Sequence, residues 1–141
     1  MDVIILEKTD IRGILFDNIT FSDALLFAER AIAEKKQIVV HTPNAEILQR
    51  CIEEKEIQDI VSSAELILPD GAGVLLAGKI LGTPIKEKIA GVDFGEKILE
   101  LAGNKGYRVY FLGGKPGIAI AAAEKMREKY KGLNIVGTHD G

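Results

Sequence analysis

A chain of 141 residues with 47% hydrophobic content can bury one good core, so we expect a single domain over residues 1–141. Its net charge of −3 and the absence of a dense block of Lys and Arg argue against nucleic acid as the main partner, because phosphate binding needs clustered cations. The only cysteine, Cys51, excludes an intrachain disulfide and a cysteine-based metal cluster, and the lack of a secretory signal or a long uncharged apolar stretch predicts a soluble chain.

The first residues predict a short β-hairpin. Two apolar runs, residues 3–6 and 13–16, flank a charged segment that we expect to form the turn. Thr20 and Asp23 then offer helix caps, and apolar residues recur at helical spacing as far as Lys35 and Lys36, which predicts a helix.

Strands and helices alternate over the rest of the chain. The apolar periodicity predicts strands at residues 37–41, 65–68, 108–112 and 133–138, and helices at residues 45–54, 56–63, 72–81, 94–102 and 118–130. Asp93 is expected to cap the helix at 94–102, and a left-handed stop at residues 103–106 to end it. This alternation is typical of α/β folds, in which a mostly parallel sheet is flanked by helices.

The helix at residues 72–81 is apolar nearly all round, with Lys79 as its only charge. Such a helix is either packed deep inside its own domain or covers the surface of a partner.

Polar side chains follow the strand at residues 37–41. Pro43 ends the strand because it cannot donate a ladder hydrogen bond, and Asn44 is a good N-cap for the next helix. Thr42 and Asn44 are either turn and cap residues only, or ligands for sugar hydroxyls, since each can donate and accept hydrogen bonds. His41 is most simply a packed strand residue.

The strand at residues 65–68 ends in a similar polar corner, in which Asp70 is the only carboxylate. If the two strands are parallel neighbours, Thr42, Asn44 and Asp70 gather at one edge of the sheet. The carboxyl ends of strands are where open α/β sheets bind ligands. Asp70 is therefore either a helix N-cap or a general base within reach of a substrate hydroxyl.

A glycine-rich turn joins the strand at residues 108–112 to the helix at residues 118–130. We expect this turn to have free main-chain N–H groups, which together with the helix dipole favour the binding of a phosphate. The alternative interpretation is a plain tight turn that binds nothing. The sequence fits neither a Walker A loop nor a G-x-G-x-x-G fingerprint, and Leu76 replaces the third glycine after Asp70, which argues against a nicotinamide or flavin enzyme. The residues of this turn that we select as candidates are Gly113, Gly114, Lys115 and Gly117.

No metal site is expected. His41 and His139 are the only histidines, and they lie far in the sequence from any cluster of Asp or Glu.

Four stretches in order, residues 42–46, 68–74, 90–94 and 111–117, resemble the WecG/TagA/CpsF glycosyltransferases, glycosyltransferase family 26. The similarity covers nearly the whole chain, and four ordered motifs at matching spacing are far more specific than any one glycine turn. The resemblance is greatest to the TagA branch. Members of that branch use UDP-N-acetylmannosamine and a polyprenyl-diphosphate-linked N-acetylglucosamine to make the linkage unit of wall teichoic acid.

The resemblance implies a Rossmann-like nucleotide-sugar-binding domain that carries out an inverting, metal-independent transfer without a cofactor. Asp70 matches the family's candidate base, and Thr42 and Asn44 match residues of its pocket. The glycine turn would help to hold the nucleotide. The family also implies a cytoplasmic enzyme that works at the inner face of the membrane on a lipid-linked acceptor.

Two departures from the family pattern matter. Lys88 stands where the family commonly has an arginine, which keeps the positive charge for a substrate diphosphate but loses the bidentate fork. The family also continues beyond the point that corresponds to Gly141, with more of the sheet and a basic C-terminal appendage. We therefore expect part of the nucleotide site to be missing and the chain alone to be weakly active or inactive.

Two alternatives to this function stay open. The first is a member of the same family with another UDP-sugar donor, such as N-acetylmannosaminuronic acid or glucose. The second is a non-catalytic nucleotide-sugar-binding or assembly module, in which the apolar helix at residues 72–81 packs against a second copy to form a homo-oligomer.

Overall fold

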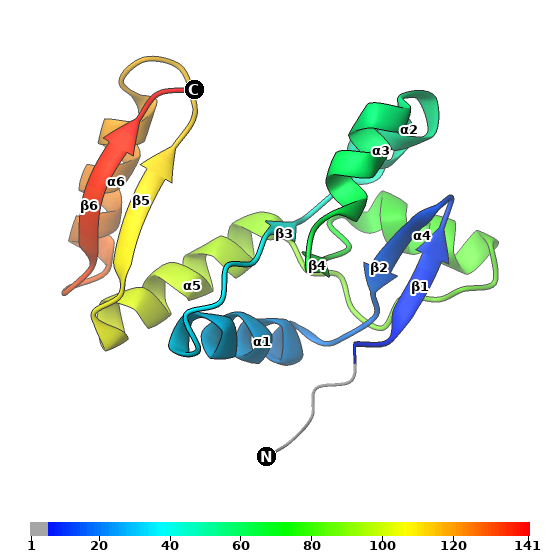
Figure 1. The fold of residues 1–141 in the computed structure, drawn as a ribbon, viewed down its shortest axis with the longest axis horizontal. Coiled ribbons are helices and arrows are strands. Elements are labelled where there is room, and N and C mark those ends of the chain that lie inside the picture. Colours follow the sequence, from blue (N-terminus) through cyan, green and yellow to red (C-terminus); the bar gives the residue numbers. More distant parts are fainter. Residues whose placement is uncertain (1–5) are drawn as a thin grey trace. The chain divides into compact units, whose positions relative to one another are not determined.

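The computed structural model describes residues 6–141, and the chain divides into two compact units, Met1–Phe94 and Gly95–Gly141 (Figure 1). Of the strand predicted at residues 3–6, residues 3–5 lie outside the described part of the chain, and Leu6 is not in a strand.

The first unit begins with an antiparallel hairpin of β1 (Lys8–Ile11) and β2 (Ile14–Asp17). Arg12 and Gly13 alone form the turn, and their φ angles of 57° and 89° give the twist that two-residue hairpins need. The predicted hairpin is confirmed, but the placement of its turn is wrong, because residues 8–11 form a strand. Alternate residues of β1 are buried, a pattern that its charged side chains conceal in the sequence.

Two short parallel strands position the polar corners. β3 (Val40–His41) pairs with β4 (Leu66–Ile67), and a main-chain bond of 2.8 Å from the Leu68 N–H to the His41 carbonyl continues the ladder. Both strands are shorter than predicted, but the prediction that they are parallel neighbours is confirmed.

The helices of the first unit lie where the sequence predicts them. The first begins with a reciprocal cap, in which the Thr20 hydroxyl accepts the Asp23 N–H and the Asp23 carboxylate accepts the Thr20 N–H, both at 3.2 Å. The Thr20 hydroxyl and N–H, as donors to this carboxylate, hold the pKa of Asp23 below its usual value. The four helices are α1 (Phe21–Ala33), α2 (Ala45–Glu53), α3 (Lys55–Ser62) and α4 (Ala72–Ile80).

The core of this unit joins the hairpin, β4 and the helices α2, α3 and α4 (Figure 1). Cys51 belongs to it, and burial raises the pKa of its thiol. The buried members of this cluster are Ile11, Ile14, Phe16, Leu48, Cys51, Val61, Ile67 and Val74.

A buried carboxylate closes the edge of β4 that faces away from β3. Asp17, at the end of β2, is fully buried, and its Oδ2 accepts the Ile67 N–H at 2.8 Å. Its Oδ1 lies 2.7 Å from Lys8 Nζ. Because the Ile67 N–H points to the side opposite β3, the carboxylate takes the place of a further strand.

Helix α4 is packed on one face only. Val74 and Gly78 are buried, whereas Leu76 is 58% exposed and Ile80 is 75% exposed. The interpretation of this helix as internal all round is therefore wrong for the chain as described.

Helix α5 (Gly91–Lys105) is longer at both ends than predicted. Asp93 lies inside its first turn, so the prediction that Asp93 caps the helix is wrong. The left-handed stop is confirmed at Gly106, whose φ is 71°, and the Tyr107 N–H donates to the Ala102 carbonyl at 2.9 Å, as in a Schellman cap.

The second unit is a parallel strand pair with a helix on one face. β5 (Arg108–Leu112) pairs with β6 (Asn134–His139), and α6 (Ile118–Lys129) packs against both strands (Figure 1). These elements match the predicted ones within one residue at each end. The buried core of this unit consists of Ala102, Ala123, Leu133 and Ile135.

Parallel strands joined by helices, together with the N-terminal hairpin, give the α/β, Rossmann-like class that the sequence predicts. Within residues 6–141, no helix is both long enough and apolar enough to span a bilayer.

Candidate functional site

The two polar corners lie side by side, as the parallel-strand argument predicts. The Asp70 N–H donates to the Pro43 carbonyl at 3.4 Å, just beyond the carboxyl ends of β3 and β4. Helices α2 and α4, which start at these corners, also approach closely, since a Cβ on Gly73 would lie 2.8 Å from Ala45 Cβ. The carboxyl ends of parallel strands thus bring Thr42, Asn44 and Asp70 to one edge of the first unit.

Asp70 does not cap the helix that follows it. The N-cap of α4 is Gly71, with a φ of 88° and no side-chain cap bond, so the N-cap interpretation of Asp70 is wrong for α4. Instead, Asp70 Oδ2 accepts the N–H of Gly91, the first residue of α5, at 3.0 Å. Its Oδ1 has no hydrogen bond or ion pair with another residue of 6–141, and the side chain is half-buried. One oxygen is therefore fixed and the other can accept a proton from a ligand.

The hydroxyl of Thr42 lies against the same glycine. A Cβ built on Gly91 would be 2.4 Å from Thr42 Oγ1, a distance that no real side chain tolerates. Thr42 and Asp70 therefore meet at the main chain of Gly91. The local sequence around either side chain carries no sign of this contact.

Asn44 acts as the N-cap of α2. Its Oδ1 accepts the Ile47 N–H at 3.0 Å, so the predicted cap is confirmed. The side chain is exposed, and within the described part of the chain its Nδ2 makes no hydrogen bond. The amide donor is thus available to a ligand while the oxygen holds the helix.

The connection between α4 and α5 delivers Lys88 and Gly91 to this edge. Asn18, which is 6% exposed, holds it with both side-chain atoms: Oδ1 accepts the Lys86 N–H at 2.8 Å and Nδ2 donates to the Pro84 carbonyl at 3.2 Å. Lys88 itself is exposed and forms no ion pair with another residue of 6–141.

Two further ties fix the same connection. The Glu87 carboxylate accepts the Phe21 N–H at the start of α1 at 2.8 Å. The fully buried Ile89 donates its N–H to the Pro69 carbonyl at 2.9 Å, one residue before Asp70. Asn18 and Glu87 are missing from the sequence-based candidates, because their partners lie 66 to 68 residues away.

The glycine turn belongs to the second unit. Gly113, Gly114 and Gly117 have φ angles of 122°, 84° and 86°, which only glycine adopts without strain. Gly113 and Gly114 line an open hollow of about 430 Å³ together with the side chains of Tyr110 and Ile118. Lys115 is exposed.

An acidic side chain occupies the start of α6. Asp140 Oδ1 accepts the Gly117 N–H at 3.2 Å, and the Gly141 N–H donates to the Gly114 carbonyl at 3.0 Å. A phosphate at this helix start would compete with the Asp140 carboxylate for the same donor and would be repelled by its charge. Asp140 is absent from the sequence-based candidates, since nothing in its neighbourhood indicates a partner 23 residues away.

Replacing Asp140 by asparagine is expected to strengthen the binding of inorganic diphosphate at this helix start about threefold, because the charge disappears while an oxygen remains for the Gly117 N–H. Isothermal titration calorimetry of diphosphate at low and high salt measures this, and the gain should shrink as salt screens the charge. Weaker binding by the variant would contradict the prediction.

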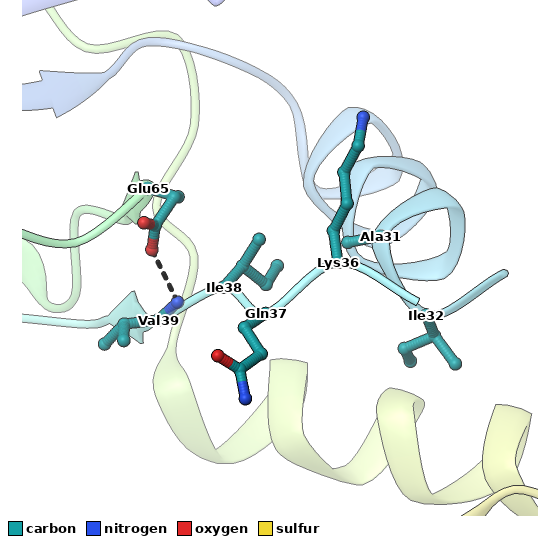
Figure 2. Close-up of a pocket in the computed structure, with 7 residues that line it drawn as sticks. All are labelled: Ala31, Ile32, Lys36, Gln37, Ile38, Val39 and Glu65. Atoms are coloured by element: carbon teal, nitrogen blue, oxygen red, sulfur yellow. Dashed lines mark hydrogen bonds between the residues drawn. The ribbon is translucent and has the colours of Figure 1, made fainter. Parts of the chain in front are cut away.

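A hollow of about 680 Å³ in the first unit lies at the other end of β3 and β4 (Figure 2). Figure 2 shows its acidic residue, Glu65, turned to the main chain, where Oε2 accepts the Val39 N–H at 2.7 Å. This bond holds the pKa of Glu65 below its usual value. This hollow lies at the amino ends of the strands, and its acidic group already has a partner. We therefore take the Asp70 edge as the candidate site.

Within residues 6–141, no group of three or more His, Cys, Asp or Glu side chains is placed to hold a metal ion.

Comparison with known proteins gives a family match and several relatives. Residues 9–141 match the family described as "Glycosyl transferase WecG/TagA/CpsF family". A protein of Bacillus spizizenii named N-acetylglucosaminyldiphosphoundecaprenol N-acetyl-beta-D-mannosaminyltransferase is 32% identical over 108 residues, which cover 77% of this chain and 42% of the relative.

Proteins with the same name from two other organisms match more of the chain. The Bacillus subtilis protein is 27% identical over 96% of this chain and 54% of its own length. The Staphylococcus aureus protein is 25% identical over 94% of this chain and 53% of its own length. The chain thus spans about half the length of the curated relatives that it matches.

Proposed function

The chain belongs to the WecG/TagA/CpsF family of glycosyltransferases, and on that premise we propose that it carries the sugar-transfer site of an N-acetylmannosaminyltransferase. The donor is UDP-N-acetylmannosamine, and the acceptor is N-acetylglucosamine linked through a diphosphate to a polyprenyl lipid. The product is the linkage unit of wall teichoic acid. The shared name of the relatives supports N-acetylmannosamine as the transferred sugar and a diphosphate-linked N-acetylglucosamine lipid as the acceptor.

Asp70 is the general base of this reaction. Its free Oδ1 takes the proton of the attacking acceptor hydroxyl, whose oxygen forms a bond to the anomeric carbon of the donor. The bond from that carbon to the UDP oxygen breaks at the opposite face, and UDP leaves with the electron pair, so the configuration inverts. The single observation that carries this role is the geometry of the carboxylate, with one oxygen fixed by the Gly91 N–H and the other open.

The remaining candidate residues bind the substrates. Thr42 and the free amide of Asn44 bind sugar hydroxyls beside Asp70, and Lys88 attracts a diphosphate from the exposed connection before α5. In the glycine turn, the Gly113 N–H already donates to the His139 carbonyl at 2.9 Å and the Gly117 N–H to Asp140. The N–H groups of Gly114 and Lys115 therefore contribute the donors for the nucleotide, because a departing diphosphate must be met by positive charge or by N–H groups. The enzyme works on its lipid-linked acceptor as a peripheral protein at the inner face of the cell membrane.

The rival is a module that binds a nucleotide sugar or assists assembly without catalysis. Both functions predict that UDP binds, but only the enzyme predicts that labelled N-acetylmannosamine passes to a lipid-linked N-acetylglucosamine. The open Oδ1 of Asp70 at the candidate site favours the enzyme, since transfer to a hydroxyl needs a group that can take its proton.

The test has two steps. UDP and UDP-N-acetylmannosamine are titrated calorimetrically into the chain and into a chimera that continues after Gly141 with the remaining part of the Bacillus subtilis relative. Both forms are then assayed for sugar transfer to a short-chain prenyl-diphosphate N-acetylglucosamine. We expect the chimera to bind and transfer, and the chain alone to do so weakly or not at all. Binding without transfer by the chimera would favour the module, and absence of binding by both would overturn the nucleotide-sugar assignment.

A further inference from the structure

Gly91 is the point at which the two polar corners and the start of α5 meet. Its N–H donates to Asp70 Oδ2 at 3.0 Å, and the place where its side chain would stand is taken by Thr42 Oγ1. A Cβ there would also lie 3.1 Å from Thr42 Cβ, closer than side chains normally pack. One residue without a side chain thus touches two candidate site residues through its main chain alone.

We propose that Gly91 is a positioning residue of the transfer site, which fixes the Asp70 carboxylate through its N–H and admits the Thr42 hydroxyl through its missing side chain. This assignment rests on the proposed role of Asp70 as the base. Without this bond, the Asp70 carboxylate, in the turn between β4 and α4, would rotate about its Cβ–Cγ bond and present either oxygen to the substrate. With Oδ2 bound to Gly91, only Oδ1 is presented to the acceptor hydroxyl.

Alignment of this kind has a large effect on rate, because a displacement of about 1 Å at a reacting group can cost a factor of about 100. The support of Gly91 itself is firm. It lies two residues after Ile89, which is fully buried and hydrogen-bonded to Pro69, and it opens a helix of 15 residues.

Two pairs of variants separate the missing side chain from the N–H. Gly91→Ala adds the Cβ that collides with Thr42 and keeps the N–H. We expect kcat to fall at least about tenfold, with the UDP dissociation constant unchanged within about twofold. In a Thr42→Ala background Oγ1 and Cγ2 are gone, and only the Cβ of residue 42, at 3.1 Å, still crowds the added methyl group. A shift of a few tenths of an ångström relieves that contact, so adding Gly91→Ala is expected to change kcat by less than about threefold.

Gly91→Pro in the same Thr42→Ala background removes the N–H. Proline is favoured at the first position of a helix, so α5 is expected to form. Because Gly91→Ala/Thr42→Ala carries a Cβ and an N–H, it is the matched control. We expect the proline variant to lose a further tenfold or more in kcat, with KM for the donor little changed, because Asp70 loses its fixed orientation. Circular dichroism of all variants checks that the helices are retained.

The outcomes distinguish this assignment from the proposed function. If the wild-type chimera transfers no sugar, the proposed function fails, and the role of Gly91 fails with it. If the wild type is active and Gly91→Ala keeps its kcat, or if the proline and alanine variants are equally active in the Thr42→Ala background, the positioning role is overturned and the proposed function stands. If the kcat loss of the double variant Gly91→Ala/Thr42→Ala equals the product of the two single losses, the two residues act independently. This result would also contradict the shared contact.

Discussion

Replacing Asp70 by asparagine is expected to reduce sugar transfer by the chimera about 10³-fold while leaving the UDP dissociation constant within about twofold. Asparagine keeps the shape of the side chain and an oxygen for the Gly91 N–H, so the local structure should persist. It cannot accept the proton of the acceptor hydroxyl, so only the chemical step is affected. Rapid-quench kinetics measures the transfer step, and calorimetry measures UDP binding.

Asp93→Asn is the matched control for Asp70→Asn. Asp93 is exposed in the first turn of α5, two residues after Gly91, and its replacement removes the same charge from the same edge. We expect this variant to keep its transfer rate within about twofold, since charge alone is weakly felt at an exposed position. Equal losses of transfer rate in the two variants would show a general effect of charge at this edge. A fully active Asp70→Asn variant would mean that another residue is the base.

Replacing Asp17 by alanine is expected to lower the free energy of unfolding of the first unit by about 3 kcal/mol. The change leaves the Ile67 N–H without its acceptor inside the core and removes the partner of Lys8. The loss of stability should appear first in β4, because no strand of residues 6–141 covers this edge and the bond to Asp17 holds it. Urea unfolding followed by far-UV circular dichroism measures the free energy, and amide hydrogen exchange of the β4 peptide locates it.

Asp10→Ala provides the comparison within the same hairpin. Asp10 Oδ1 accepts the Gly13 N–H at 2.8 Å, but this bond is exposed at the turn, so its loss is expected to cost less than about 1 kcal/mol. Similar losses in the two variants would contradict a special role for the buried carboxylate. Tyrosine fluorescence is unsuited to this measurement, since all three tyrosines, at positions 107, 110 and 130, lie in the second unit.

Elements with local signals could be predicted from the sequence. Thr20 and Asn44 cap the helices that directly follow them, and Gly106 ends α5 in the left-handed conformation that the glycine predicts. The neighbouring corners of Thr42 and Asp70 also follow from sequence, because parallel strands place their carboxyl ends at one edge of a sheet.

Elements that depend on distant partners could not be predicted. Helix α5 begins before Asp93 because Asp70, 21 residues upstream, accepts the N–H of Gly91. The strand β1 carries charged side chains, and its buried face is visible only once β2 and α4 pack on it. Asn18 and Asp17 look like ordinary turn residues after a strand, yet their partners lie 50 to 68 residues away.

The tied connection between α4 and α5 has a consequence for protein engineering. Connections between helices are usually where a chain tolerates inserted residues, since their length matters little to the core. In residues 81–90 the bonds from Asn18, Glu87 and Ile89 fix the path of the main chain, so one added residue would shift the start of α5 relative to Asp70. Affinity tags, fluorescent labels and new chain ends therefore belong elsewhere, for example at the exposed residues 35–37 after α1.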